Sequence, residues 1–222
     1  MRTYEIELIG HTPALMHADD VLAADALKDW RVSPDNKDLS VAGDDRSPPW
    51  TYQTYLYHDG EHLAVPQENL MACLRKAGER IPKGKSNYKA LTQVGLLMMS
   101  DFCDLTSNGR QYAISEFLAI KDRPFSEQFA AVRDMGLELK VKRAKVGQAK
   151  HVRVRLMLKN WKVRGTLAVT EPAINDKVLE QLFEIAGRYV GLFDWRPSSP
   201  KSPGPYGIFK AKLTAASATL VA

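Results

Sequence analysis

The residues with the clearest chemical pattern are cations gathered between positions 140 and 164. This segment holds ten Lys and Arg side chains and no Asp or Glu: Lys140, Lys142, Arg143, Lys145, Lys150, Arg153, Arg155, Lys159, Lys162 and Arg164. Lys140 and Lys142 are two residues apart, as are Arg153 and Arg155, so each pair shares one face if the backbone is extended. The pattern predicts a basic two-stranded arm that contacts the phosphates of a nucleic acid.

We expect this arm to turn near Gly147 and Gln148. Ordinary protein surfaces intersperse both signs of charge, whereas this segment carries only one, so it should attract a polyanion. The alternative is a solvated hairpin whose charges serve solubility alone. The net charge of +5 conceals the concentration, because residues 1–70 carry −8, residues 71–165 carry +12 and residues 166–222 carry +1.

A second group of cations lies on and just after the first predicted helix: Arg75, Lys76, Arg80, Lys83 and Lys85. These side chains could follow a phosphate backbone. The alternative for Arg80 and Lys83 is the preference of cations for a helix C-terminus, where the helix dipole is negative. The nearby glycines do not form a nucleotide-binding P-loop, because five residues separate Gly78 from Gly84 where that motif has four, and a helix precedes them.

A loop dense in glycine, proline and serine follows the last predicted helix and mixes cations with aromatic residues: Arg188, Trp195, Arg196, Lys201 and Tyr206. Aromatic faces stack on unpaired bases and cations hold phosphates, so this composition favours single-stranded nucleic acid. Trp195 and Tyr206 are the stacking candidates. The alternative is that Trp195 fixes the loop to the core.

Patterns for catalysis or metal binding are weak. None of the five histidines lies in an HExxH or Ser-His-Asp context. His11 and His17, after the first predicted strand, could act as acid and base in metal-free RNA cleavage, although anchoring of a loop explains them as well. His58 and His62 flank a predicted turn, which is too little for a metal site. We therefore expect no catalytic residue, no metal and no cofactor.

Length and composition indicate one domain, residues 1–222, with long insertions. We place these insertions at about residues 18–62, acidic and loop-rich with a hairpin, and at about 121–160, the basic arm. Cys73 and Cys103 have no CxxC partner, which fits a reducing cytoplasm. No apolar run approaches the roughly 20 residues of a membrane span, and no secretory signal is evident. We expect a cytoplasmic protein with no membrane partner.

Hydrophobic periodicity predicts the elements that must position these groups. Strands are expected at residues 3–9, 112–120, 137–143, 151–158, 161–169 and 206–214, a hairpin at 50–65 around Asp59 and Gly60, and helices after Pro66 and at 176–189. The order strand, helix, strands, helix, strand matches an α+β protein. It is typical of a ferredoxin-like or RNA-recognition-type βαββαβ core, here with insertions that form β-hairpin arms.

Three segments resemble the RAMP superfamily of CRISPR-associated RNA-binding proteins, in particular its guide-RNA-binding backbone subunits. Residues 63–78, LAVPQENLMACLRKAG, are similar to that family's junction of a strand and a helix. Residues 187–209 resemble its glycine-rich loop, with Gly191 and Gly204 among the matching positions. Residues 9–17, IGHTPALMH, resemble the opening of several members.

The resemblance implies an RNA-recognition-type core, assembly along a nucleic acid as a filament, and a β-hairpin that reaches between neighbouring sites. It also implies partnership with other effector-complex subunits in antiviral defence. Gln67 and Glu68 stand where the family has small residues, and Ala72 replaces a common glycine. The chain is also short for such a subunit, so it resembles a divergent member, and carriage by a phage or other mobile element stays open.

The sequence therefore favours a non-enzymatic protein that binds single-stranded RNA or DNA by its phosphate backbone and assembles cooperatively with copies of itself. The residues do not distinguish RNA from DNA. Two alternatives stay open: a metal-free endoribonuclease of the RAMP type that uses His11 or His17, and a protein-only adaptor whose acidic first third binds a basic partner. If nucleic acid is bound, the arm, the basic helix and the glycine-rich loop should line one continuous groove.

Overall fold

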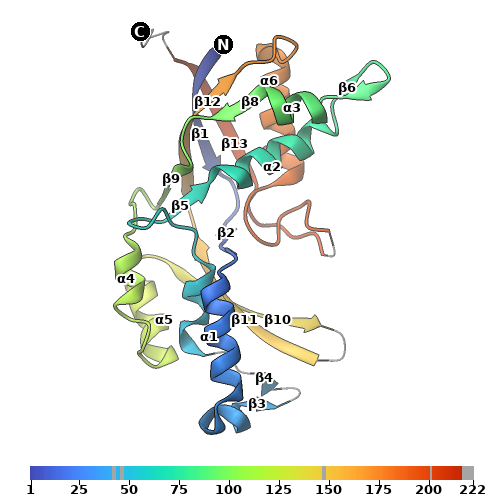
Figure 1. The fold of residues 1–222 in the computed structure, drawn as a ribbon. Coiled ribbons are helices and arrows are strands. Elements are labelled where there is room, and N and C mark those ends of the chain that lie inside the picture. Colours follow the sequence, from blue (N-terminus) through green and yellow to red (C-terminus); the bar gives the residue numbers. More distant parts are fainter. Residues whose placement is uncertain (42–43, 46–47, 147–148, 201, 217–222) are drawn as a thin grey trace. The chain divides into compact units, whose positions relative to one another are not determined.

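The computed structural model describes residues 1–41, 44–45, 48–146, 149–200 and 202–216, and their contacts divide the chain into two compact units. Unit 1 consists of Met1–Ala14, His58–Tyr112 and Lys159–Ala222, and unit 2 of Leu15–Tyr57 and Ala113–Leu158. Figure 1 shows the elements of both units. The two segments of unit 2 overlap the ranges 18–62 and 121–160 that the sequence marks as insertions.

Unit 1 is built on a mixed-order antiparallel sheet. Its strands are β1 (Arg2–Gly10), β5 (Ala64–Pro66), β8 (Leu96–Met98), β9 (Phe102–Ser107), β12 (Trp161–Val169) and β13 (Phe209–Ala215). The strand order is β13-β1-β12-β9-β5, β8 also pairs β12, and every neighbouring pair is antiparallel. The first and last of the long strands therefore lie side by side, although the whole chain separates them.

Alternation along β1 decides which face of this sheet is buried. Tyr4, Ile6 and Leu8 are buried, whereas Glu5 and Ile9 are exposed. Successive side chains of a strand point to opposite faces, so apolar residues at every second position form one face that packs in the core. The two long helices of unit 1 lie on the same side of the sheet (Figure 1), and they bury this core face.

The helices of unit 1 place their apolar stripes against one another and the sheet. They are α2 (Gln67–Gly78), α3 (Lys89–Gly95), α6 (Asp176–Ile185) and the π-helical turn η3 (Ala186–Val190), and a small hairpin, β6 (Pro82–Lys83) with β7 (Ser86–Asn87), follows α2. Leu70, Leu74 and Ala77 of α2 are fully buried, as the sequence predicts. The Asn175 side chain accepts a hydrogen bond of 3.0 Å from the Val178 N–H and begins α6.

Unit 2 contains a second sheet with short helices. Its elements are α1 (Val21–Val32), η1 (Pro34–Leu39), β3 (Ser40–Val41), β4 (Asp44–Asp45), η2 (Pro49–Tyr55), α4 (Ile114–Leu118), α5 (Phe125–Asp134), β10 (Glu138–Val146) and β11 (Ala149–Leu158), and β2 (Ala14–Leu15) lies where the chain enters this unit. The sheet order is β10-β11-β4-β3. Tyr52, Phe117 and Leu156 are fully buried and form its core.

The α+β class and most of the predicted elements are confirmed. Strands at 2–10, 138–146, 149–158, 161–169 and 209–215 and helices at 67–78 and 176–185 match the predicted ranges closely. No helix in the part of the chain that the structure describes is both long and apolar enough to cross a membrane.

Two predicted elements of unit 2 and its border are wrong. The hairpin expected at 50–65 is largely replaced by η2, because Thr51 and Thr54 turn their hydroxyl groups onto the carbonyl groups of Pro48 and Thr51 and so close helical turns. The Asp59-Gly60 turn keeps an isolated bridge between His58 and Leu63 and a hydrogen bond from the Asp59 N–H to the His62 carbonyl.

The strand expected at 112–120 is also wrong, because residues 114–118 form α4. The Glu116 carboxylate accepts a hydrogen bond of 2.9 Å from the Ala113 N–H, and this bond favours a helical start over an extended one. In addition, the acidic segment expected to be loop-rich contains α1, which begins with the Asp20 carboxylate accepting bonds from two helical N–H groups.

The alternation of β1 leads to a stability test. Leu8 is 0% exposed and Ile9 is 37% exposed. We expect Leu8→Ala to lower the free energy of unfolding by about 2–5 kcal/mol, because a buried cavity replaces the side chain. The neighbouring control Ile9→Ala should cost about 1 kcal/mol or less. Urea denaturation measures both, and equal losses would contradict the assignment of the core face.

Candidate nucleic-acid interface

The basic arm of unit 2 is formed by β10 and β11, and this confirms the predicted two-stranded hairpin. The two strands pair antiparallel, with Lys140 opposite Arg155 and Lys142 opposite Arg153. Four cations thus stand on one face in two adjacent pairs. The predicted tip at residues 147–148 lies outside the described residues, and so do the side chains of Arg143, Lys145 and Lys150.

The four paired cations of the arm differ in their exposure to solvent. Arg155 is only 4% exposed, its Cζ atom lies 3.8 Å from the centroid of the Tyr55 ring, and its Nη1 donates to the Val154 carbonyl at 3.2 Å. Arg153 is exposed, and Lys140 and Lys142 are half-buried. The guanidinium of Arg155 therefore packs inside unit 2, while the other three cations remain accessible.

The cations predicted on and just after the first helix lie on the outer side of α2, in the turn that follows it and on the β6–β7 hairpin. Arg75, Arg80, Lys83 and Lys85 are exposed. Lys76 is half-buried, and its Nζ donates a hydrogen bond of 2.9 Å to the Ser198 carbonyl. This bond leaves the ammonium charge in place and joins α2 to the glycine-rich loop.

Glu79 is the acid nearest to this group of cations along α2, and it is engaged elsewhere. Its carboxylate lies 2.6 Å from the Lys89 ammonium. That hydrogen bond lowers the pKa of Glu79 from its usual value. Glu79 therefore stays ionised but paired with Lys89, and the outer side of α2 keeps a net positive charge.

Tyr189 is a residue that sequence reasoning missed. It lies in η3 and is 47% exposed, which is high for a ring beside a folded core. The Cζ atoms of Arg188 and Arg80 lie 5.4 Å and 6.0 Å from the centroid of its ring. We name Arg80, Arg188 and Tyr189 the arginine–tyrosine cluster. An Arg-Tyr pair just after an amphipathic helix is the sequence signal that could have indicated it.

The aromatic residues of the glycine-rich loop contact each other. The rings of Trp195 and Tyr206 stack with centroids 5.3 Å apart and an interplanar angle of 27°. A Cβ atom at Gly204 would overlap the Trp195 backbone and indole, so only glycine permits this close approach. Both rings are half-buried. These contacts favour the interpretation that Trp195 fixes the loop.

The loop holds an unusual backbone in place. Phe193 and Trp195 have φ angles of 68° and 50°, a left-handed backbone conformation that residues other than glycine rarely adopt. The Arg196 guanidinium donates a hydrogen bond of 2.7 Å to the Phe193 carbonyl and closes this turn. Arg196 is thus partly occupied within the loop. Lys201 lies outside the described residues.

Unit 1 brings α2, η3 and the glycine-rich loop together. The Cys73 thiol of α2 contacts the Gly191 carbonyl at 3.4 Å and the Ala186 carbonyl at 3.7 Å. Burial raises the pKa of this thiol to about 12, so it is a structural group and not a nucleophile. Two of the three predicted elements therefore meet. The arm belongs to unit 2, and the expectation of one continuous groove stays a prediction.

The histidines are dispersed. His11 is exposed in unit 1, whereas His17 belongs to unit 2, where its ring lies 5.1 Å from that of Tyr55. The Nδ1 atom of His58 accepts a hydrogen bond of 3.1 Å from the Gly60 N–H within the turn. Within the described ranges, no group of three or more His, Cys, Asp or Glu side chains could hold a metal ion.

Comparison with models of known protein families finds none that matches this chain, and comparison with curated proteins finds no similar sequence. The relation to the RAMP superfamily therefore remains a prediction from the three segments that resemble it. The geometry of the cations and aromatic rings carries the functional inference.

The glycine-rich loop offers a test of its close packing. Gly207 has φ of 70°, and a Cβ atom there would overlap the Leu192 carbonyl oxygen, whereas Gly84 has φ of 58° with open space around it. We expect Gly84→Ala to cost about 1–2 kcal/mol of stability from the backbone alone. Gly207→Ala should cost more, because the backbone must also shift. Thermal unfolding compares the two, and equal costs would contradict the packing.

The buried guanidinium of the arm offers a second test. Arg155→Ala removes a stacked, buried side chain, so we expect it to lower the free energy of unfolding by about 2–4 kcal/mol. The matched control Arg153→Ala alters an exposed cation of the same strand and should cost about 0.5 kcal/mol or less. A chemical denaturation curve for each variant decides, and an Arg155→Ala protein of unchanged stability would show that Arg155 does not support unit 2.

Proposed function

We propose that this chain is a non-enzymatic protein that binds single-stranded RNA or DNA. The observation that carries the proposal is the arginine–tyrosine cluster, an exposed aromatic ring with one guanidinium from the turn that follows helix α2 and another beside it in η3. Rings of this kind stack on unpaired bases, and guanidinium groups hold the adjoining phosphates. Neighbouring cations Arg75, Lys83 and Lys85 would extend the contact along the backbone.

The basic arm adds a second contact in this proposal. Arg153, Lys140 and Lys142 are its accessible cations, while Arg155 anchors the base of the arm inside unit 2. A phosphate-directed arm reads charge and spacing, so it would bind RNA and DNA alike. We expect Trp195 and Tyr206 to support the loop and to contribute less to base stacking, because each already stacks on the other.

We infer that unit 1 is a ferredoxin-like core of the RNA-recognition type. Support comes from the order β13-β1-β12-β9, in which α2 lies between β1 and β9 along the chain and α6 between β12 and β13. A relation to the RAMP superfamily fits the same order. Assembly with further copies along the nucleic acid, or with other effector-complex subunits, belongs to this proposal.

The outer face of the sheet is a poor alternative place for the nucleic acid. Glu7 on β1 pairs with Arg164 at 2.5 Å and lies 3.9 Å from the Lys162 ammonium, and Glu5 accepts a hydrogen bond from Thr166. The hydrogen bond from Arg164 lowers the pKa of Glu7, so its negative charge persists. Arg164 and Lys162 on this face therefore lie beside a carboxylate that stays charged, and we place the interface on the helix and loop side.

The two cysteines agree with a reducing cytoplasm as the proposed location. Cys73 and Cys103 are both buried free thiols. Burial raises the pKa of Cys103 to about 11, so neither thiol is suited to exchange reactions.

Salt-titrated fluorescence anisotropy with labelled single strands of about 30 nucleotides tests the proposal, with RNA and DNA of the same sequence side by side. Tyr189→Ala should weaken binding by about 1–3 kcal/mol, the usual worth of one stacked base. Arg80→Glu with Arg188→Glu should reduce the slope of log affinity against log salt by about 1–2, because two phosphate contacts are lost.

Matched variants distinguish the cluster from general surface chemistry. Phe102→Ala removes another exposed aromatic ring, and Lys177→Glu with Lys212→Glu makes the same charge change elsewhere on unit 1. Both should bind as the unaltered chain does. Affinity weaker than about 1 μM at low salt would end the proposal, as would equal effects in cluster and control variants. Cleavage of the RNA in EDTA would favour the endoribonuclease alternative.

A further inference from the structure

Among the residues that the structure describes, no strand pairs with the outer edge of β13, the last strand of unit 1. β13 pairs with β1 on one side and stands at the end of the strand order. The His11 N–H donates to the Ile208 carbonyl and the Ala216 N–H donates to the Thr3 carbonyl. Because bonding alternates along an antiparallel ladder, the even-numbered residues face β1. The N–H and C=O groups of Ala211 and Leu213 therefore point away from it.

The free edge is open over a short, defined stretch. At Phe209 the edge is covered, because a Cβ atom at Gly187 would overlap the Phe209 carbonyl oxygen, which places η3 directly against it. No backbone hydrogen bond from the described residues reaches the outward groups of Ala211 and Leu213. An extended chain of another molecule could pair with these groups.

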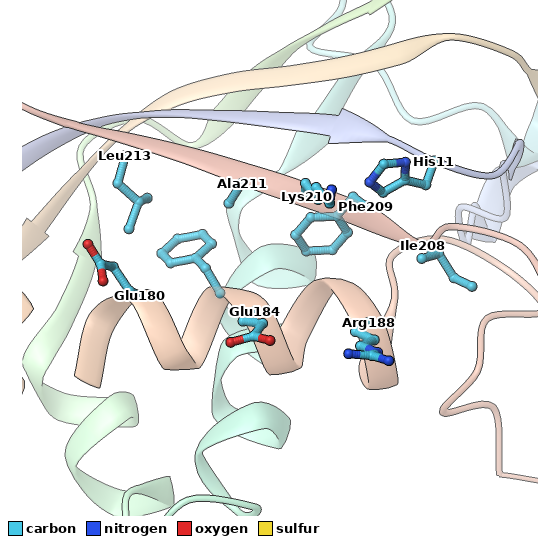
Figure 2. A pocket seen from close by; sticks show the side chains of 10 residues that line it. His11, Glu180, Glu184, Arg188, Ile208, Phe209, Lys210, Ala211 and Leu213 are labelled. Carbon is cyan, nitrogen blue, oxygen red and sulfur yellow. The ribbon is translucent and has the colours of Figure 1, made fainter. Parts of the chain in front are cut away.

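A groove of about 640 Å³ runs beside this edge, between β13 and α6 (Figure 2). Phe183 and Phe209 are almost fully buried at its floor. Ala211 and Leu213 are half-buried along its wall. An incoming strand that pairs with β13 would thus place every second side chain over an apolar surface.

Charges along the groove are arranged in order. Glu180 and Glu184 are one helical turn apart on α6, both exposed, and Arg188 follows one turn later. Figure 2 shows Glu180 near Leu213 at one end and Arg188 at the other end, where His11 and Ile208 also lie. Lys210 of β13 also lines the groove, so the side formed by α6 is acidic, and the cations come from β13 and η3.

We propose that this groove binds an extended peptide of another protein by adding a strand to β13. The peptide has apolar residues at alternate positions, Lys or Arg facing Glu180 and Glu184, and Asp or Glu toward Arg188. Main-chain bonds to Ala211 and Leu213 give affinity, and the side-chain positions give specificity. This binding does not depend on nucleic acid.

Charge decides between a peptide and a nucleic acid in this groove. Phosphates beside Glu180 and Glu184 would be repelled, whereas the same carboxylates attract a basic side chain. The arginine–tyrosine cluster shares Arg188 with the groove, so the two sites adjoin without requiring the same ligand.

Selection of phage-displayed random peptides of about nine residues, the length of a long strand, on the full chain tests the proposal. Enriched peptides should alternate apolar residues and carry Lys or Arg near one end. Ala211→Pro removes an outward N–H and leaves the ladder to β1 intact, because proline is tolerated at an open edge. It should weaken a labelled enriched peptide by about tenfold or more.

Charge variants test the same peptide without altering the strand. Glu184→Lys should weaken it by about fivefold or more, and Glu61→Lys, an equal change at an exposed residue outside the groove, should leave it unchanged. These helix-surface variants keep the test valid if Ala211→Pro unfolds the chain.

Four results would overturn the proposal. They are a selection without enrichment, enriched peptides without basic residues, displacement of the peptide by single-stranded oligonucleotides that is as strong in the Tyr189→Ala variant as in the unaltered chain, and self-association in sedimentation that Ala211→Pro abolishes. The third would assign the groove to nucleic acid, and the fourth would assign it to a second copy of this chain.

Discussion

The burial of a single indole ring, that of Trp161, orders most of unit 1. Trp161 stands at the start of β12, is 0% exposed, and meets Phe193 of the glycine-rich loop and Phe209 of β13 edge to face. Its Nε1 donates a hydrogen bond of 2.8 Å to the Thr12 carbonyl, which satisfies the only polar atom of the ring. Gly10 leaves room for the ring. One side chain thereby fixes β12, β13 and the loop relative to one another. The arginine–tyrosine cluster is positioned by the same packing, because η3 lies against β13.

Much of the fold could be predicted because local patterns and tertiary structure agree. The alternation in β1, the Asn175 cap of α6 and the long basic strands β10 and β11 are signals carried by adjacent residues. The strands predicted at residues 50–55 and 114–118 are wrong because segments that contain Thr, Tyr and Ile generally favour strands. Hydrogen bonds from the threonine hydroxyl groups and from the Ala113 N–H to Glu116 outweighed that preference, and such bonds are decided residue by residue.

The sequence predicts which elements carry the candidate site, but not which of their side chains are exposed. A period of two places Arg153 and Arg155 on one face, yet it cannot tell that Tyr55, distant in sequence, covers one of them. Trp195 and Tyr206 were identified as an aromatic pair, but their mutual stacking depends on the close approach at Gly204. Arg188 is adjacent to Tyr189 in sequence, but Arg80 reaches the Tyr189 ring only because the turn after α2 packs close to η3. Each of these outcomes depends on how segments fold back on one another, which local sequence patterns do not encode.

The open edge of β13 also bears on how the protein avoids aggregation. An exposed strand edge is a template on which identical chains can pair. β13 carries Lys210 and Lys212, both exposed and two residues apart, so both leave the strand on the same side of the sheet, and Lys210 also lines the groove. If two copies joined through this edge about a twofold axis, these lysines would gather on one face of the combined sheet and repel one another. The same edge can therefore stay open without promoting fibres.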